Sequence, residues 1–241
     1  MIASATTSDD QHHMHDLVLI PGLGSDSAVW QRTIDALGEA ARTYVGDTLS
    51  DGTLAAMAAR IVDSAPPRFA LAGVSMGGMV ALEIMRSAPE RVARLALLDT
   101  SARPDTPDQS RRRREINSAI LSTDDLASFA AGAINFMIDV TATEDVRRAL
   151  IEMAVRVGAS AYVRQNEAMI ARTDLRPVLP TVRVPTLVTV GANDTMTPLP
   201  CSEEIREGIA QAAFHVIPDC GHLPPIEKPA VVAQLLREWL G

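Results

Sequence analysis

The chain has 241 residues, of which 47% are hydrophobic, and its formal net charge at neutral pH is −8. This length suits one large α/β domain with room for an inserted subdomain, and the hydrophobic content excludes gross disorder. The acidic balance argues against nucleic acid or an anionic membrane as the main partner, so we expect neither.

Residues 1–15 are predicted to form a polar N-terminal arm. Because they contain no basic segment followed by an apolar run, we expect no signal peptide. No stretch of the chain reaches the roughly 20 apolar residues of a membrane span. The two cysteines, Cys201 and Cys220, are too few for a disulfide framework. They fit a reducing compartment, which predicts a cytoplasmic location.

Three histidines of the arm (His12, His13 and His15) are close in sequence. No cysteine or acidic cluster lies nearby to complete a metal site, so we expect them to hold none.

Strands and helices are predicted to alternate in the first hundred residues. Continuous apolar runs are typical of strands buried on both faces. The strands are expected at 17–20, 43–46, 70–74 and 95–98. The helices are expected at 27–40, 54–65 and 76–88. This alternation predicts a parallel sheet with right-handed crossovers.

The alternation stops at Ser101 and no buried-strand pattern returns before about residue 180. Helical patterns recur instead, at 111–121, 124–138, 144–157 and 160–171. We therefore predict that residues 101–180 form an inserted helical cap, and that 16–100 and 181–241 form the core. The run Arg111-Arg112-Arg113-Arg114 is interpreted as a solvated face of a cap helix rather than an anion-recruiting patch.

The strand pattern resumes after the insertion. A strand is expected at 185–190 and another at 213–217, with helices near 200–211 and 228–240. The whole chain thus predicts about six parallel strands with helices on both faces.

The stretch Gly73-Val74-Ser75-Met76-Gly77 follows an apolar run directly and precedes a helical pattern. It predicts a strand, a tight turn with Ser75 at its apex, and a helix that leaves underneath. Gly73 and Gly77 lack the Cβ that would clash in such a turn. A serine held there is a candidate nucleophile, although a glycine-rich turn without chemistry would have the same pattern.

A serine nucleophile needs a base, and the base needs a group that orients it. Asp194 follows the 185–190 strand and His222 follows the 213–217 strand, so both should lie at the carboxyl edge of the sheet. The chain order is nucleophile, acid, histidine. Asp99, at the end of the 95–98 strand, is the second candidate for the acid. Asp219 is interpreted as bracing the histidine loop.

An oxyanion hole would complete this group of residues. One donor is expected to be the backbone N–H of Met76 at the start of the helix. The other is expected from the loop Pro21-Gly22-Leu23-Gly24 after the first strand, and the N–H of Leu23 is our choice. An ordinary glycine turn is the alternative reading of that loop.

Taken together, these motifs resemble the α/β-hydrolase superfamily, in particular its small bacterial carboxylesterases and enol-lactonases. The resemblance covers about 17–100 and 181–240, and further landmarks are Pro89-Glu90-Arg91-Val92, Gly191-Ala192-Asn193-Asp194 and Gly221-His222. It implies the triad roles for Ser75, Asp194 and His222, and the oxyanion roles for Leu23 and Met76. The inserted cap of that family matches the break at 101–180.

Two features depart from the family pattern. Pro21 stands where the first loop usually has histidine. The chain also begins at what would be the third strand of the family, because residues 1–15 are too short and polar for the usual leading hairpin.

The resemblance implies a serine hydrolase that cleaves an ester, lactone or thioester of a small to medium apolar substrate, without a cofactor or metal. The same triad could serve C–C bond hydrolysis, acyl transfer or perhydrolysis, and a ligand receptor with little turnover is a further alternative. A monomer or homodimer is expected. The cap offers possible pocket-lining residues, which are Phe129, Phe136, Met137, Met153, Tyr162 and Met169.

Overall fold

Six strands form a single sheet in the computed structural model, which describes residues 14–241. The strands are β1 (His15–Ile20), β2 (Ala41–Val45), β3 (Phe69–Val74), β4 (Val92–Leu98), β5 (Thr186–Gly191) and β6 (Ala213–Ile217). Residues 1–13 of the predicted arm, which include His12 and His13, lie outside the described residues. β1 begins at His15, two residues before the apolar run that predicted it.

The strand order is β2-β1-β3-β4-β5-β6, and every neighbouring pair is parallel. This confirms the predicted six-stranded parallel sheet. The chain runs from β1 outward to β2 and then returns to β3 on the other side of β1. The carboxyl ends of β1 and β3 therefore flank the switch point, where ligands bind in open α/β sheets.

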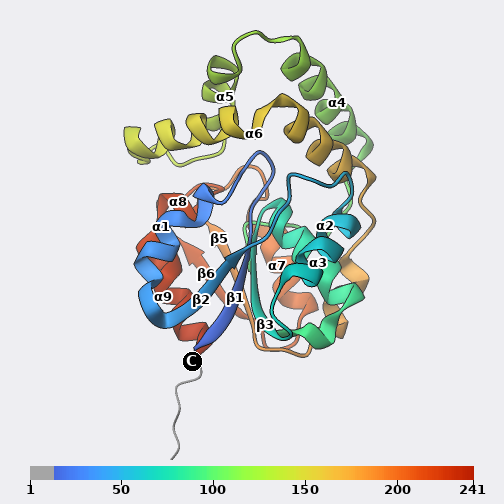
Figure 1. Cartoon of the computed structure of the whole chain (residues 1–241), viewed down its shortest axis with the longest axis vertical. Helices are drawn as coiled ribbons and strands as arrows, with labels where there is room; N and C mark the ends of the chain where they lie inside the picture. The colour runs from blue at the N-terminus through green and yellow to red at the C-terminus, as the bar shows by residue number, and fades with distance from the viewer. Residues whose placement is uncertain (1–13) are drawn as a thin grey trace, which may run out of the picture.

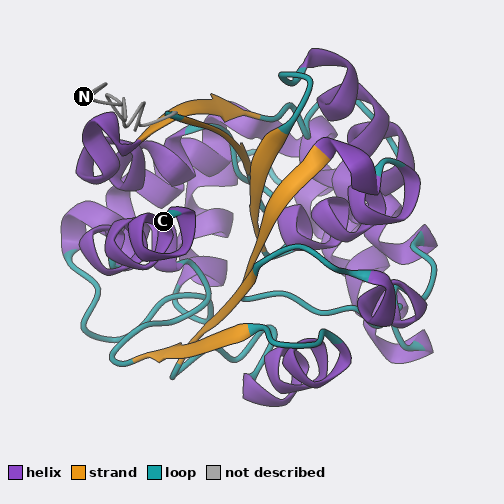
Figure 2. Ribbon diagram, turned by 90° about the horizontal axis from the view of Figure 1, so that it is seen from below, coloured by secondary structure: helices purple, strands orange, loops and turns teal. Residues whose placement is uncertain are grey.

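Helices cover both faces of the sheet (Figure 2). They are α1 (Ala28–Leu37), α2 (Leu54–Ser64), α3 (Met76–Ser87), α4 (Pro107–Ser122), α5 (Leu126–Ile134), α6 (Glu144–Ala171), α7 (Leu199–Gly208), α8 (Pro224–Glu227) and α9 (Pro229–Leu240). Three short 3₁₀ helices are η1 (Gly38–Ala40), η2 (Pro89–Arg91) and η3 (Arg176–Thr181). No helix among the described residues is both long and apolar enough to cross a membrane.

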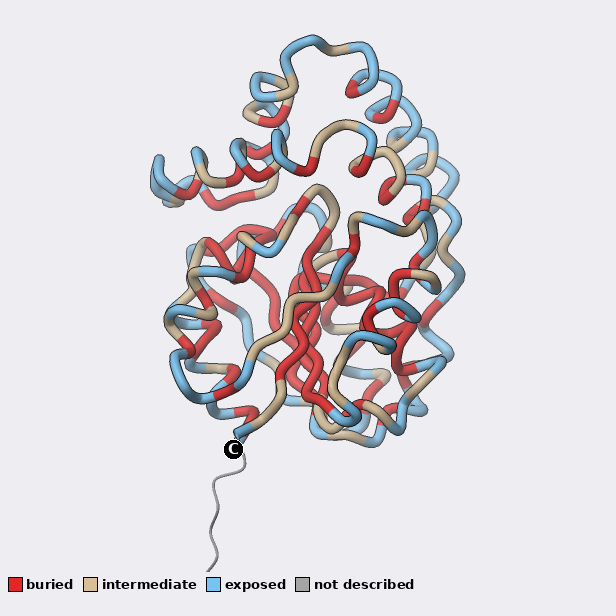
Figure 3. Tube along the Cα trace, viewed as in Figure 1, coloured by how far each residue is buried: buried red, intermediate tan, exposed pale blue. Residues whose placement is uncertain are grey.

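Alternate residues of β1 belong to two different hydrophobic cores. Leu17 and Leu19 pack in the cluster that contains Trp30 of α1 and residues of α9. Val18 and Ile20 pack in the cluster formed with α2, α3 and α7. The buried strands lie between these helical layers (Figure 3). Because both of their faces are covered, the inner strands β1, β3, β4 and β5 are mostly buried and rich in apolar residues, whereas the edge strands β2 and β6 are mostly not buried.

The segment between β4 and β5 carries α4, α5 and α6, which lie above one edge of the sheet (Figure 1). The helices predicted at 144–157 and 160–171 form the two halves of α6, which are separated by a kink at Gly158, where the backbone is not helical (φ 74°, ψ 162°). Glycine adopts this conformation without the steric cost of a Cβ, so α6 can bend there. The helix predicted at 124–138 ends earlier, at Ile134.

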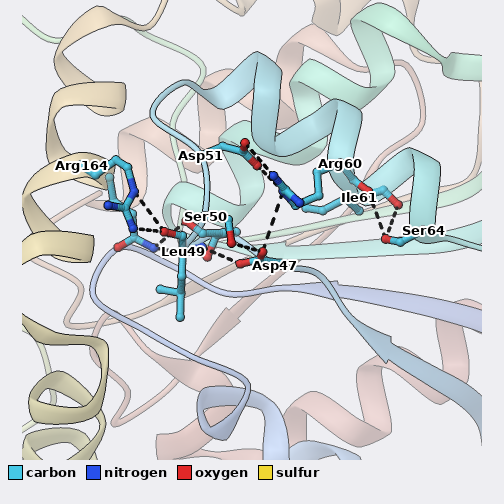
Figure 4. Close-up of polar contacts among 10 residues, drawn as sticks. Asp47, Leu49, Ser50, Asp51, Arg60, Ile61, Ser64 and Arg164 are labelled. Carbon is cyan, nitrogen blue, oxygen red and sulfur yellow. Dashed lines mark hydrogen bonds and ion pairs between the residues drawn. The ribbon is translucent and has the colours of Figure 1, made fainter.

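The second half of α6 is attached to loops of the sheet domain. Arg164 donates hydrogen bonds to the carbonyl oxygen of Leu49, in the loop after β2 (Figure 4). Gln165, which is fully buried, donates to the carbonyl oxygen of Thr48 at 3.0 Å and accepts from the N–H of Gly24 at 2.8 Å. Buried amide groups need such partners, so these bonds hold α6 over the loop that follows β1.

Two glycines allow α3 to pass close to β3 and β1. A Cβ on Gly73 would lie 2.2 Å from the carbonyl oxygen of Gly77, and a Cβ on Gly77 would lie 2.2 Å from that of Ile20. These contacts are far below van der Waals distance and involve backbone, which a rotamer change cannot relieve. The turn around Ser75 therefore requires glycine on both sides.

We expect Gly73→Ala to lower the free energy of unfolding by at least about 3 kcal/mol, because the added methyl overpacks rigid backbone. Gly132→Ala, in α5, is the matched control. A Cβ there meets nothing within 4 Å, and the helix gains up to about 1 kcal/mol in propensity. Urea unfolding of both variants measures this difference. Equal stability of the two variants would contradict the close-packing argument.

Candidate active site

Ser75 occupies the turn between β3 and α3 with φ 56° and ψ −121°, a conformation that non-glycine residues rarely adopt. Its N–H donates to the carbonyl oxygen of Leu98 at 2.9 Å, and its own carbonyl oxygen accepts from the hydroxyl of Thr100 at 2.6 Å. These bonds to the end of β4 and the residues after it hold the strained residue in place. The Ser75 side chain lines a cavity of about 370 Å³.

His222 lies in the loop after β6 and contacts Ser75. Its Nε2 is 2.7 Å from the Ser75 Oγ, and its Nδ1 is 2.9 Å from Oδ2 of Asp194. The ring is almost fully buried. The structure therefore brings the three residues predicted for the triad into one continuous chain of hydrogen bonds.

Asp194 lies in the loop after β5 and is held by Thr197 as well as His222. Its Oδ1 accepts from the N–H groups of Met196 at 2.8 Å and Thr197 at 3.1 Å, and its Oδ2 accepts from the Thr197 hydroxyl at 2.7 Å. Burial alone would raise the pKa of Asp194. The hydrogen bond and positive charge of His222, together with the Thr197 bonds, overcome it and lower the pKa to about 2. Asp194 is an anion at neutral pH.

Asp99, the second candidate for the acid, lies behind this pair. Its Oδ1 accepts from the N–H of Gly191 at 2.7 Å, whereas its buried Oδ2 has no hydrogen-bond partner. Burial raises the pKa of Asp99 well above its usual range, and the nearby Asp194 carboxylate raises it further. We infer that Asp99 is the neutral member of the pair, because two close carboxylates in a buried site do not both ionise.

One ligand atom each from Asp99, Asp194 and His222 lies within 4.8 Å of the others, so these residues could in principle hold a metal ion. Both ring nitrogens of His222 already face hydrogen-bond partners, Ser75 on one side and Asp194 on the other. An ion would have to displace one of them. The arrangement suits proton transfer better than ligation.

The glycine loop after β1 lies beside the serine. A Cβ on Gly22 would be 3.2 Å from that of Ser75, and Leu23 lines the cavity. The amide of Gly24 is engaged by Gln165, and that of Ser25 donates to the carbonyl oxygen of Gly22 at 3.2 Å.

The cavity extends from Ser75 and His222 beneath α4, α5 and α6. Five of the six aromatic and methionine residues expected as lining reach it, which are Phe129, Met137, Met153, Tyr162 and Met169. Phe136 does not, because its side chain is 75% exposed. Cys201 also lines the cavity, whereas Cys220 is buried and burial raises its pKa above the usual range. Both thiols are free.

Glu227 is a supporting residue that the sequence analysis did not single out. Its carboxylate accepts from the N–H groups of Gly221 at 3.0 Å and Leu223 at 2.9 Å, on either side of His222, and from that of Asp139 at 2.8 Å. The N–H of His222 donates to the carbonyl oxygen of Met137 at 2.7 Å. The histidine loop is thereby attached both to α8 and to the segment after α5. Asp219, in the same loop, adopts a positive φ of 50°.

The sequence matches the model of the alpha/beta hydrolase family over residues 17–235. The chain belongs to the alpha/beta hydrolase family. The predicted family, fold and enzyme class are thereby confirmed. This hydrolase is 28% identical over 234 residues to the pimeloyl-[acyl-carrier protein] methyl ester esterase of Nitrosomonas europaea, and the match covers 89% of this chain and 91% of that protein.

Solved structures of hydrolases share the fold. An esterase from Thermogutta terrifontis, with malate bound, matches with a TM-score of 0.85 and 29% identity, covering 94% of this hydrolase and 89% of that chain. The enol-lactonase of Burkholderia xenovorans matches with a TM-score of 0.79 and 22% identity, covering 96% and 93%. At that identity the second likeness shows the fold alone.

Because the pKa of Asp99 in the folded protein lies well above its ordinary value, its contribution opposes folding more strongly as pH rises above that ordinary value. Between pH 5 and pH 8, we expect the free energy of unfolding of Asp99→Asn to fall less than that of the unmodified hydrolase. At pH 8 the variant should be the more stable of the two. The asparagine keeps an acceptor for the Gly191 N–H. Urea denaturation at both pH values measures this.

Asp63→Asn, on the exposed face of α2, is the control and should follow the unmodified protein at both pH values. A less stable Asp99→Asn variant at pH 8 would contradict a raised pKa of Asp99 as the source of this pH dependence.

Proposed function

We propose that this chain is a serine hydrolase that cleaves a carboxylic ester, lactone or thioester through an acyl-enzyme. The observation that carries the proposal is the chain of hydrogen bonds from Asp194 through His222 to Ser75, which ends at an open cavity. The Nitrosomonas relative and the Thermogutta protein are both named as esterases. These names support ester cleavage over C–C hydrolysis, acyl transfer or perhydrolysis.

In the first half-reaction, the Ser75 Oγ attacks the substrate carbonyl carbon while its proton passes to Nε2 of His222. Asp194 holds the other ring nitrogen and stabilises the imidazolium. The tetrahedral intermediate collapses, and the alcohol or thiol leaves with the proton from His222. In the second half, His222 removes a proton from water, which attacks the acyl-enzyme and releases the acid.

The oxyanion donors in this proposal are the N–H groups of Leu23 and Met76. Met76 is the first residue of α3, and the first N–H groups of a helix have no intrahelical acceptor. Leu23 lies in the loop beside Ser75, where the amides of Gly24 and Ser25 already have partners. This supports Leu23 as the donor from that loop. Backbone donors fixed in this way stabilise the developing charge without reorganisation.

We propose that residues 16–100 and 181–241 are the catalytic core and that 101–180 are a cap that selects the substrate. The position of α4, α5 and α6 over the cavity supports this division. The residues that carry the proposed steps require no cofactor. The two free thiols support a cytoplasmic location, and we expect a monomer or homodimer that acts on small molecules.

Ser75→Ala should lower kcat/KM on p-nitrophenyl butanoate by about 10³-fold or more, because the acyl-enzyme cannot form. Ser118→Ala, at an exposed position of α4, is the control and should retain full activity. Steady-state release of p-nitrophenol measures both. Equal activity of the two variants would overturn the role of Ser75, and binding of the ester without any turnover by the unmodified protein would favour a ligand receptor.

Asp194→Asn should lower kcat by about 10³- to 10⁴-fold with a much smaller change in KM, since the amide cannot stabilise the imidazolium. The same p-nitrophenyl ester separates the two constants. A loss confined to KM would contradict the proposed role of Asp194.

A further inference from the structure

The cavity above Ser75 is lined by two chemically different sets of residues. Beneath α5 and the first half of α6 the lining is apolar, and its members are Leu126, Phe129, Ala130, Ile134, Leu150 and Met153. Beneath α4 and the end of α6 it is polar, and its members are Arg103, Asp105, Thr106, Gln109, Arg113 and Arg172. Figure 1 shows α5 and α4 on opposite sides of the inserted segment. An occupant of the whole cavity would therefore meet both surfaces.

Arg113 differs from the other three arginines of its run. Arg111, Arg112 and Arg114 are exposed, whereas the Arg113 side chain is 22% exposed and lines the cavity. The interpretation of the run as a solvated face therefore holds for three of its members. Arg113 instead points its guanidinium inward from α4.

Arg113 and Arg172 share a single carboxylate. Nε of Arg113 and Nη1 of Arg172 each lie 2.6 Å from an oxygen of Asp105, which is 1% exposed. Arg113 also donates through Nη1 to Asn166 at 2.8 Å, and Arg172 donates to the carbonyl oxygens of Arg103 and Met169. Burial lowers the pKa of Arg172, although a guanidinium stays protonated at neutral pH.

The charges around the cavity do not balance. Among the described residues that line it, Asp105 is the one acidic residue, and three are arginines. Arg103 forms a bidentate pair with Glu204, which is not part of the lining. One positive charge therefore remains on the buried pair Arg113 and Arg172. Partly desolvated guanidinium groups with spare N–H donors are the preferred partners of carboxylates.

The polar end also adjoins the reacting centre. Tyr162 packs on Gly24, where an added Cβ would lie 3.0 Å from its ring, and Gly24 follows Leu23 directly. Tyr162, Arg113 and Ser75 line the same cavity, and the positive charge of Arg113 opposes the rise in the pKa of Tyr162 that burial causes. A substrate whose carbonyl lies at Ser75 would thus also reach Arg113 with an anionic group.

We propose that Arg113 and Arg172 bind a carboxylate carried by the substrate at a distance from the scissile ester, while the apolar end of the cavity holds the other half. This selectivity rests on the proposed esterase function and specifies its substrate class. The substrate carboxylate would add a second negative charge beside that of Asp105. Two carboxylates would then balance the two guanidinium groups. The carboxylate can belong to the acyl half or to the alcohol half of the ester.

Two matched pairs of esters test the proposal and separate these halves. Ethyl hydrogen adipate is compared with ethyl hexanoate for the acyl half, and 4-(butanoyloxy)butanoate with butyl butanoate for the alcohol half. Acid release is followed in a pH-stat at pH 7.5. The unmodified hydrolase should prefer the anionic member of one pair by about tenfold or more in kcat/KM, mainly through KM, and the preference should shrink as salt is added.

Arg113→Gln should reduce this preference to about twofold or less, and Arg113→Lys should keep part of it because it keeps the charge. Arg111→Gln is the control. It removes an arginine two residues away in sequence whose side chain is 62% exposed and paired with Asp108, and it should leave both rates unchanged. Far-ultraviolet circular dichroism and Tm report the folding of each variant.

A neutral member preferred in both pairs would overturn the proposal, as would an Arg113→Gln variant that slows both members of a pair equally. Should Arg113→Gln fail to fold, inhibition of ethyl hexanoate hydrolysis decides the matter. Adipate should inhibit the unmodified protein at a lower concentration than hexanoate does, and the reverse order would overturn the proposal. Hydrolysis of neither pair would instead contradict the proposed esterase function.

Discussion

The conformation of Ser75 is the constraint on which the rest of the site depends. A φ of 56° at a non-glycine residue is unfavourable, and it persists because its surroundings determine it fully. Gly73 and Gly77 let β3, α3 and β1 approach one another at backbone distance, and the end of β4 accepts the Ser75 N–H. The serine is thereby presented above the sheet edge, where the loops after β5 and β6 bring Asp194 and His222 to it.

The carboxylates of Asp194 and Asp99 lie close together at the same edge of the sheet. Asp194 is charged because His222 and Thr197 bind it, whereas Asp99 has an orphaned oxygen in a buried position. The pKa of Asp99 is raised and that of Asp194 is lowered, so the negative charge is concentrated on the carboxylate that contacts the imidazole. This division explains how two acids can follow neighbouring strands without weakening the orientation of His222.

Much of this architecture was predictable because it depends on local patterns. Short local patterns, most of them apolar runs, predicted the six strands, and the Gly-x-Ser-x-Gly motif predicted the turn, since both signals lie within a few residues. Other features depend on contacts between distant segments. Nothing near Arg113 in sequence shows that it turns inward, and Glu227 serves the histidine loop through backbone amides that sequence does not reveal.

If Ser75 is an activated nucleophile, a fluorophosphonate should label it covalently. The folded protein is treated with a fluorophosphonate, the intact mass is measured, and the modified peptide is sequenced by mass spectrometry. We expect a single adduct on Ser75 that forms far more slowly in His222→Ala. Folded protein that acquires no adduct, or acquires it on another serine or on Cys201, would contradict the role of Ser75 as the nucleophile.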